Sequence, residues 1–511
     1  MIVKDTAGGS GEDEDLTSRE VELKLELEPG SGEALLSHPL LRDRIGESQQ
    51  SCSVYYDTRK SSLRNAGVTL RVRRTGNAFV QTVKAVARGA AGMFDRHEWE
   101  DRISGPEPDL DSAAIRIDQL KRAGIRNRLR PVFETIVNRR AATLQRNGTV
   151  VELVLDQGEV VAGKRRQPLA EVELELLKGS RSALFEIARE LHESVPLRLG
   201  VLTKSERGER LASGKGGRAM KAEPIRLGAD MTAGQAFQTI AFACIRHFRV
   251  NEPLVIAAHD IDALHQSRVA LRRLRSSFSV FRPILAPDAA RQFKDELRTL
   301  ASKLGDARNL DVLIQRRGEE LTRKSRRALI DRRGWAYDRA VEALRSPDAR
   351  TMMIDLAEWL ALGSFAEWHG AHEADRPVVP FSADTLDRFW KKVKRRGKHL
   401  TELDEDARHK LRIAAKKLRY SGEFFAQLYA SETQIPRRNA FLAEMETLQD
   451  MLGALNDLVT ERALERDLRK LDIMLPASKR DSAQDREAVD ALLAQAEASF
   501  ARLQTIGPFW R

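Results

Sequence analysis

Hydrophobic and polar residues alternate along the first part of the chain, from Glu20 to about Arg210. Side chains at alternate positions of a β-strand face the same side of the sheet, so this alternation predicts strands. It is clearest in residues 20–27, 68–74, 79–85, 97–103, 150–156 and 170–176. We therefore expect an α+β domain at 20–211 that is built on an antiparallel sheet with flanking helices.

The pattern changes after residue 227. From there to the end, apolar residues recur at intervals of three and four, which predicts an all-helical domain at 228–511. A Gly- and Lys-rich stretch without periodicity lies between the two patterns and predicts a linker at 212–227. Residues 1–19 are rich in glycine and acidic residues, and we expect them to form a disordered tail.

The helical half contains an internal duplication. HQSRVALRRLRSSFSVF begins at His265 and HKLRIAAKKLRYSGEFF begins at His409, and a related phrase follows each copy, KLGDARNLDV from Lys303 and MLGALNDLVT from Met451. Basic positions in the two copies have the same spacings of 3, 4 and 3, which place four side chains on one face of a helix. These two basic stripes are His265, Arg268, Arg272 and Arg275 in the first copy, and His409, Arg412, Lys416 and Arg419 in the second.

The two basic stripes predict a duplicated helical bundle that binds a long anion. A basic helix face is more often simply solvated, and a helical histidine more often packs through a hydrogen bond than binds a ligand. The repetition of one spacing in two copies favours binding over solvation. Among neighbouring arginines, the histidines are expected to be neutral near pH 7 until phosphate binds.

The polar faces of the predicted strands consist almost entirely of charged residues. The shared faces are Glu20, Glu22 and Lys24; Arg71 and Arg73; Glu98 and Glu100; and Glu171, Glu173 and Glu175. For any single strand, charges that face water are the simpler explanation. Together, the strands favour a closed barrel with a charged lumen and an apolar wall covered by helices. Clustered carboxylates call for a divalent metal and clustered bases for an anion, so the pattern predicts a metal–polyanion substrate.

Composition narrows the possible classes. The chain of 511 residues is too long for one core, and its two cysteines, Cys52 and Cys244, argue against a disulfide scaffold and fit a reducing compartment. No apolar run could span a bilayer and no signal pattern is present, so we expect a cytoplasmic protein with no membrane partner. The net charge of +11 would suit nucleic acid, but only 6% of residues are aromatic and no basic–aromatic repeat occurs, which disfavours it. The chain has no GxxxxGK[ST] phosphate-binding loop.

Several motifs follow one another in the first domain. ExExK stands at 20–24, YYDT at 55–58, LRVR at 70–73, QTVK at 81–84 and TKSERG at 203–208. This ordered set resembles the CYTH superfamily, the triphosphate tunnel metalloenzymes, over about 190 residues. The resemblance implies a tunnel-shaped barrel in which a metal-dependent reaction takes place on a triphosphate.

The same resemblance implies a role for each matching residue. Lys24, Arg71, Arg73 and Lys84 would be catalytic, and Arg96, Arg139 and Lys204 would bind substrate. Mg²⁺ or Mn²⁺ would be held by Glu20, Glu22, Glu98, Glu100, Asp156, Glu171 and Glu173. Arg140 is adjacent to Arg139, so either arginine could point inward, and Glu175 extends the acidic face beyond the matched glutamates.

The second domain resembles the CHAD domain, a helical module whose members are associated with inorganic polyphosphate. The two basic stripes would be its binding residues. A CYTH domain followed by a CHAD domain is an arrangement found in bacterial inorganic triphosphatases. The resemblance thus implies hydrolysis of inorganic triphosphate in the barrel and polyphosphate binding by the helices, in the cytoplasm or at polyphosphate granules. The alternatives are a thiamine triphosphatase, an adenylate cyclase, or a non-catalytic polyphosphate-binding or granule-associated protein.

Overall fold

The computed structural model describes residues 19–85, 91–112, 114–117, 120, 123–317, 319, 321–367, 371–470 and 482–511. Apart from Arg19, the predicted tail at 1–19 lies outside these residues. The chain divides into two compact units, one formed by residues up to Ala219 together with Ser346–Leu362, and one formed by Met220–Arg345 together with Gly363–Arg511. Each unit is described by itself.

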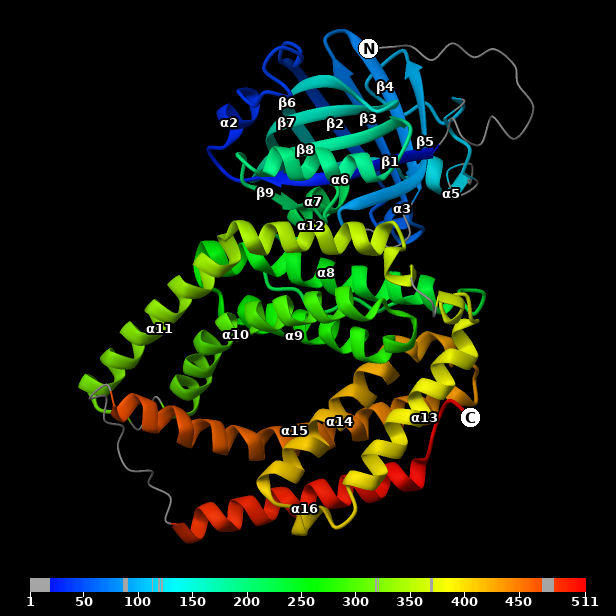
Figure 1. Cartoon of the computed structure of the whole chain (residues 1–511). Coiled ribbons are helices and arrows are strands. Elements are labelled where there is room, and N and C mark those ends of the chain that lie inside the picture. The colour runs from blue at the N-terminus through cyan, green and yellow to red at the C-terminus, as the bar shows by residue number, and fades with distance from the viewer. Residues whose placement is uncertain are drawn as a thin grey trace. The chain divides into compact units, whose positions relative to one another are not determined.

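An antiparallel barrel forms the first unit (Figure 1). Its strands are β1 (Arg19–Leu27), β2 (Gln49–Asp57), β3 (Val68–Thr75), β4 (Ala78–Ala85), β5 (Met93–Ile103), β6 (Arg130–Arg146), β7 (Thr149–Ala162), β8 (Arg165–Lys178) and β9 (Leu197–Leu199). The order is β5-β4-β3-β2-β6-β7-β8-β1, pairing of β5 with β1 closes the ring, and β9 pairs with the end of β1. The predicted barrel is confirmed.

The alternation in the sequence separates the two faces of the barrel wall. Leu23, Leu25, Val172 and Leu174 are fully buried on the outer face. Helix α6 (Ser182–His192) packs on β1 and β8, and buries its own apolar residues there. The shorter helices of this unit are α2 (Gly32–Leu36), α3 (Ser62–Asn65) and α5 (Ala123–Arg126), and α12 (Pro347–Ala361) also packs on α6 and β9. The charged residues between these apolar positions therefore face the lumen.

One end of the lumen is apolar and is closed by helix α7 (Lys204–Ala212). The residues that fill it are Tyr55, Phe133, Val137, Val160, Ala162, Leu169 and Leu211. The rings of Tyr55 and Phe133 stack with centroids 4.5 Å apart. Gly208 of α7 lies against Phe133 so closely that a Cβ on this glycine would be 2.0 Å from the ring. A missing side chain thus lets α7 enter the end of the barrel.

The second unit is helical, as predicted. Its long helices are α8 (Ala233–Ala258), α9 (Ile261–Val280), α10 (Pro287–Arg317), α11 (Arg323–Arg345), α13 (Val378–Arg396), α14 (Glu405–Phe425), α15 (Gln434–Arg469) and α16 (Ser482–Ile506), with short 3₁₀ turns between some of them. In its core, Phe281 stacks on Phe381 and makes a tilted ring contact with Phe237. None of the helices in the described ranges is long and apolar enough to cross a membrane.

The duplication seen in the sequence is also structural. The two basic stripes lie on α9 and α14, and the two related phrases lie on α10 and α15. An aspartate caps each stripe helix: Asp260 accepts a hydrogen bond from the Ala263 N–H and Asp404 from the Ala407 N–H, each at 2.7 Å. Each cap stands at the same distance in sequence before the first histidine, so the two stripes begin at the same turn of their helices.

The close fit of Gly208 generates a stability prediction. Gly208→Ala should destabilise the barrel unit by about 1–3 kcal/mol, because the new methyl group overlaps a ring that is already held by stacking. The matched control is Gly334→Ala on α11, where nothing lies within 4 Å of the new Cβ. That change should stabilise by up to about 1 kcal/mol through helix propensity. Urea denaturation of both variants measures the difference, and equal effects would contradict the fit.

Candidate functional site

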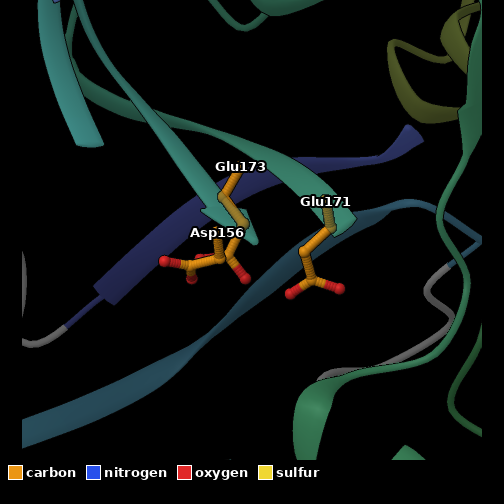
Figure 2. A group of neighbouring side chains, drawn as sticks. All are labelled: Asp156, Glu171 and Glu173. Atoms are coloured by element: carbon orange, nitrogen blue, oxygen red, sulfur yellow. The ribbon is translucent and has the colours of Figure 1, made fainter. Parts of the chain in front are cut away.

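Three carboxylates from two adjacent strands meet deep in the lumen (Figure 2). Asp156 of β7 pairs in register with Glu171 of β8, and Glu173 follows two positions later on the same face. Each side chain offers an oxygen, and these oxygens lie within 4.8 Å of one another. Asp156 and Glu171 are fully buried. Carboxylates this close need a compensating positive charge.

Three bases supply that charge. The Lys204 Nζ lies 2.8 Å from Asp156, 2.5 Å from Glu171 and 2.9 Å from Glu173. Lys24 of β1 donates to Glu171 at 2.9 Å and also to Glu173, and Arg139 of β6 lies 2.6 Å from Asp156. Burial opposes protonation of Lys204, but the three carboxylates outweigh it and raise the pKa of this lysine well above its usual value.

Local structure places both lysines. Helix α7 begins at Lys204 because Thr203 and Glu206 form reciprocal hydrogen bonds between side chain and backbone at its start, a capping box. Gly200 gives room for the other lysine, since a Cβ at this position would lie 2.7 Å from the Lys24 Cγ. The short link from β9 to α7 therefore sets the position of both ammonium groups.

A second charged group lies on β1, β3, β4 and β5. Lys84 lies 2.9 Å from both Glu20 and Glu98, and Arg96 contacts Glu20 and Glu22 at 2.9 Å each. The ion pairs around Glu100 complete the group: Arg71 at 3.5 Å and Arg73 at 3.4 Å. Burial raises the pKa of Glu100, but Arg73 and Arg71 outweigh it and lower that pKa to about 2.

The structure brings every matched CYTH residue to this one lumen. It also separates Arg139, which faces Asp156, from Arg140, which donates outward to the Gly46 carbonyl oxygen at 3.4 Å. The choice between the two arginines that the sequence left open thus falls on Arg139. The roles of the individual residues in a reaction remain predictions.

Two lumen carboxylates were not assigned from the sequence. Glu175 pairs in register with Glu22 on one side and with Glu152 on the other, so three carboxylates lie abreast on β1, β8 and β7. Burial and then the charges of Glu20, Glu98 and Glu152 raise the pKa of Glu175 to about 8. The alternation that places Asp156 in the lumen also places Glu152 there, and this signal could have identified it.

The carboxylates fit a hard divalent cation. The Oε2 atom of Glu171 is buried and accepts no hydrogen bond from the described part of the chain, and it belongs to the cluster of three acids. Burial, and the neighbouring Glu20 among other charges, raise the pKa of Glu98 to about 7. Donors that are all oxygen atoms suit Mg²⁺ or Mn²⁺.

In the helical unit, the two basic stripes meet at their centres. Arg272 of α9 donates through Nε to the Tyr420 hydroxyl of α14 at 2.7 Å, so the two helices face each other there. Burial and the charges of Arg412 and Arg272 lower the pKa of Lys416 to about 7. Asp457 of α15 acts in the opposite direction but is outweighed. We call Arg272, Arg412 and Lys416 the central cations.

The histidines that lead the stripes have different partners. Burial and then Arg308, Arg272 and Arg268 lower the pKa of His265, which agrees with the expected neutral ring. The Nδ1 of His409 lies 3.1 Å from the Asn456 amide oxygen. Arg308 and Asn456 belong to the two related phrases, so these phrases bring their polar residues to the stripes. Sequence reasoning identified the phrases but missed Arg308 as a member of the site.

A second feature of the related phrase explains the position of Arg268. A Cβ on Gly305 of α10 would lie 2.7 Å from the Arg268 Nη1, which donates to the Ala301 carbonyl oxygen at 2.9 Å. The glycine therefore leaves space for the guanidinium between α9 and α10. Burial and the charges of Arg272 and Arg308 lower the pKa of Arg268 to about 10.

Comparison with known protein families gives separate matches for the barrel unit and the helical unit. The CYTH domain family matches residues 18–208 and the CHAD domain family matches residues 239–466. The chain carries a CYTH domain followed by a CHAD domain. The charged barrel belongs to the CYTH match, and both basic stripes belong to the CHAD match.

Among curated proteins, an inorganic triphosphatase of Haemophilus influenzae is 28% identical over 206 residues, which are 39% of this chain and 57% of that protein. The chain thus matches little more than half of that relative. The CHAD domain of the plant Ricinus communis is 28% identical, covers 57% of this chain and 95% of its own, and has a TM-score of 0.45. A Hippeastrum protein described as having a dominant triphosphatase activity is 19% identical, with a TM-score of 0.31, and covers 38% of this chain and 96% of its own.

The pKa of Lys416 generates a prediction for the pH dependence of stability. Folding lowers this pKa, so between about pH 7 and the ordinary lysine value the unfolded chain binds more protons. Stability should therefore rise with pH across this window, by up to about 1.4 kcal/mol per pH unit from this group. Lys416→Met should remove that component, whereas Lys398→Met, at an exposed lysine of the same domain, should leave the slope as it is. Denaturation at pH 7 and above tests this, and parallel curves for Lys416→Met and the parent would contradict it.

Proposed function

We propose that the barrel hydrolyses inorganic triphosphate to diphosphate and phosphate with the help of Mg²⁺ or Mn²⁺. The observation that carries the proposal is the single buried lumen in which at least seven carboxylates and seven bases neutralise one another. The CYTH match and the similarity to an inorganic triphosphatase support the same reaction.

The bases of the lumen would change partners on substrate binding. Lys24, Lys84 and Lys204 are each held by two or more carboxylates, and their ammonium groups could turn to phosphoryl oxygens if those carboxylates held a divalent cation. The arginines Arg71, Arg73, Arg96 and Arg139 offer paired N–H donors that suit phosphoryl oxygens. The binding of a metal–anion pair therefore leaves no buried charge unpaired.

The lumen bases then position the phosphate chain and stabilise the charge that moves to the leaving diphosphate. Asp156, Glu171 and Glu173, together with Glu20, Glu22, Glu98 and Glu100, would hold the metal. A bound divalent cation supplies Lewis-acid polarisation of phosphoryl oxygens and a more acidic water. The apolar residues around Phe133, closed by α7, exclude water from the far end of the lumen.

The inorganic substrate is preferred to a thiamine or adenine compound because of that same closed end. Tyr55 and Phe133 are aromatic residues of the lumen, and they stack on each other in a buried cluster instead of lining a site for a base. A substrate that is charged along its whole length matches the remaining lumen. Adenosine and thiamine triphosphates are the comparison substrates, and a preference for either would overturn this choice.

We further propose that the helical domain binds inorganic polyphosphate through the two basic stripes. The central cations carry this proposal, because they come from both copies and lie together without enough negative charge to neutralise them. A chain anion can contact both stripes at once, so affinity should increase with chain length. This function places the protein in the cytoplasm, with polyphosphate granules as the place where it would concentrate.

The barrel proposal predicts the result of removing one carboxylate charge. Glu171→Gln should lower turnover of inorganic triphosphate at saturating Mg²⁺ by at least about 100-fold, because the amide cannot neutralise a cation. Glu186→Gln on α6, an exposed carboxylate of the same unit, is the control and should keep full activity. Phosphate release and circular dichroism are measured on both. Full activity of Glu171→Gln would remove this residue from the site, and a parent protein that releases no phosphate would favour the non-catalytic alternative.

The helical proposal predicts a charge effect at the centre of the stripes. Arg272→Glu combined with Lys416→Glu should abolish polyphosphate binding, because both substitutions place negative charge at the meeting point of the helices. Binding by the parent should weaken steeply with salt, as basic groups displace counterions. Filter binding with DNA of equal charge as competitor measures selectivity. Equal competition by DNA, or unchanged binding by the double variant, would contradict the proposal.

A further inference from the structure

The two basic stripes differ in charge at one end, although their sequences match. Arg275 ends the first stripe and Arg419 ends the second. Arg419 forms an ion pair with Glu423 at 2.6 Å, and the same glutamate also binds Arg273. Burial and the neighbouring Glu446 raise the pKa of Asp450 on α15. The charge of Arg419 acts in the opposite direction and is outweighed. At the Arg419 end of the stripes, carboxylates therefore accompany the bases.

Further bases lie at the Arg275 end. Lys294 and Arg298 of α10 lie near Arg275, and further bases of α13 and α14 lie beyond Lys294. We call this group the cationic patch: Arg275, Lys294, Arg298, Lys392, Arg396 and Lys417. Alignment of the two related phrases places Arg298 opposite Glu446 and Lys294 opposite Leu442. The duplication has therefore kept the stripes but replaced charge at the neighbouring positions of α10 and α15.

The patch residues are near enough to affect one another. Burial and the charges of Arg275 and Arg298 lower the pKa of Lys294. Burial and the charges of Lys294, Lys392 and Arg396 lower the pKa of Lys417. Asp295 pairs with Arg298 at 2.6 Å, but in the described part of the chain no carboxylate forms an ion pair with Lys294 or Lys417.

Hydrogen bonds between the helices hold the patch together. Arg388 of α13 donates to the Val280 carbonyl oxygen at the end of α9, at 3.1 Å. Arg396 of the same helix donates to the Lys410 carbonyl oxygen of α14, at 2.8 Å. Helix α13 is thereby fixed against both stripe helices, and its basic face lies beside Lys417. These bonds hold the helices that carry the patch in place.

The patch joins the central cations through Arg275. Arg275 lies one turn after Arg272 on α9, and its charge acts on Lys294 of α10, which in turn acts on Lys417 of α14. Half-buried cations without partners destabilise a folded protein, and a polyanion that binds them removes this penalty. An anion held at the central cations therefore meets further positive charge in one direction and carboxylates in the other.

We propose that the cationic patch is a second subsite for long-chain inorganic polyphosphate, so that a bound chain runs from the central cations toward the Arg275 end and is kept from the Arg419 end. This inference rests on the proposed binding of polyphosphate by the stripes and adds a direction to it. Nucleic acid fits the patch less well, because Trp335 on α11 is the exposed large aromatic among the described residues and the patch offers no stacking surface.

The test removes the charge of the patch and keeps its side-chain volume. Lys294→Met with Lys417→Met, in the full-length protein, should weaken binding of long-chain polyphosphate by about tenfold, a loss expected from one or two charged contacts. Binding of inorganic triphosphate to the helical domain, measured by calorimetry with a chelator present, should stay unchanged because a short chain stops at the central cations. The slope of log affinity against log salt should become smaller by about two.

A stability measurement separates a binding role from a structural one. The double Met variant should unfold at a higher temperature than the parent, since it removes two desolvated, unpartnered charges, whereas residues that hold the helices together would lower it. The control is Lys324→Met with Arg327→Met on α11, which removes the same charge at two exposed positions. An equal loss of affinity in this control, or a lower melting temperature of the patch variant, would overturn the subsite.

The outcomes also distinguish this inference from the function on which it rests. Unchanged long-chain affinity in the patch variant, with binding abolished by Arg272→Glu and Lys416→Glu, would overturn the subsite and leave the stripes as the binding site. A parent protein that binds no polyphosphate would overturn both. A larger loss of affinity for single-stranded DNA than for polyphosphate in the patch variant would assign the patch to nucleic acid and overturn the proposal.

Discussion

The requirement that buried charge be neutralised organises both units of the protein. An isolated carboxylate or ammonium group in the interior is strongly unfavourable, and it becomes tolerable only when an opposite charge and hydrogen bonds accompany it. In the barrel, Lys204 touches three acids at once, and Lys84 and Arg96 each bridge two. Most acids of the lumen are thus paired with bases of the same lumen, and the proposed metal–anion substrate carries both signs of charge.

The helical unit meets the same requirement only in part. Arg273 and Arg419 share Glu423, but the central cations and the cationic patch have few acidic neighbours. The outcome is a lowered pKa for several of the bases instead of an ion pair for each. The barrel thus pairs its bases with acids of its own, whereas several bases of the helical unit have lowered pKa values instead.

Much of this arrangement was visible in the sequence. Alternation located the strands that bear ExExK and the acidic triplet, because one face of each is apolar and the other charged. It gave no clear signal for β6, whose lumen face changes from Phe133 and Val137 to Arg139 along one strand. Glu152 lies on the same alternating face as Asp156, but its place beside Glu175 depends on a strand register that the sequence does not show. Likewise, the two basic stripes could be predicted from the spacing of their residues alone. Arg308 and Lys294 of α10 lie near the stripes because of helix packing, which one sequence does not reveal.

The apolar cluster beside α7 has a consequence for product release from the barrel. Phe133, Leu169 and Leu211 pack at one end of the lumen, and the charged residues lie in the remaining part, where they include Glu100. Under the proposed hydrolysis, substrate and products would both occupy the charged part of the lumen. Diphosphate, which keeps most of the charge of the triphosphate, would then be held by the same bases. A filled end of this kind makes product release, and not bond cleavage, the candidate for the slowest step of the proposed reaction.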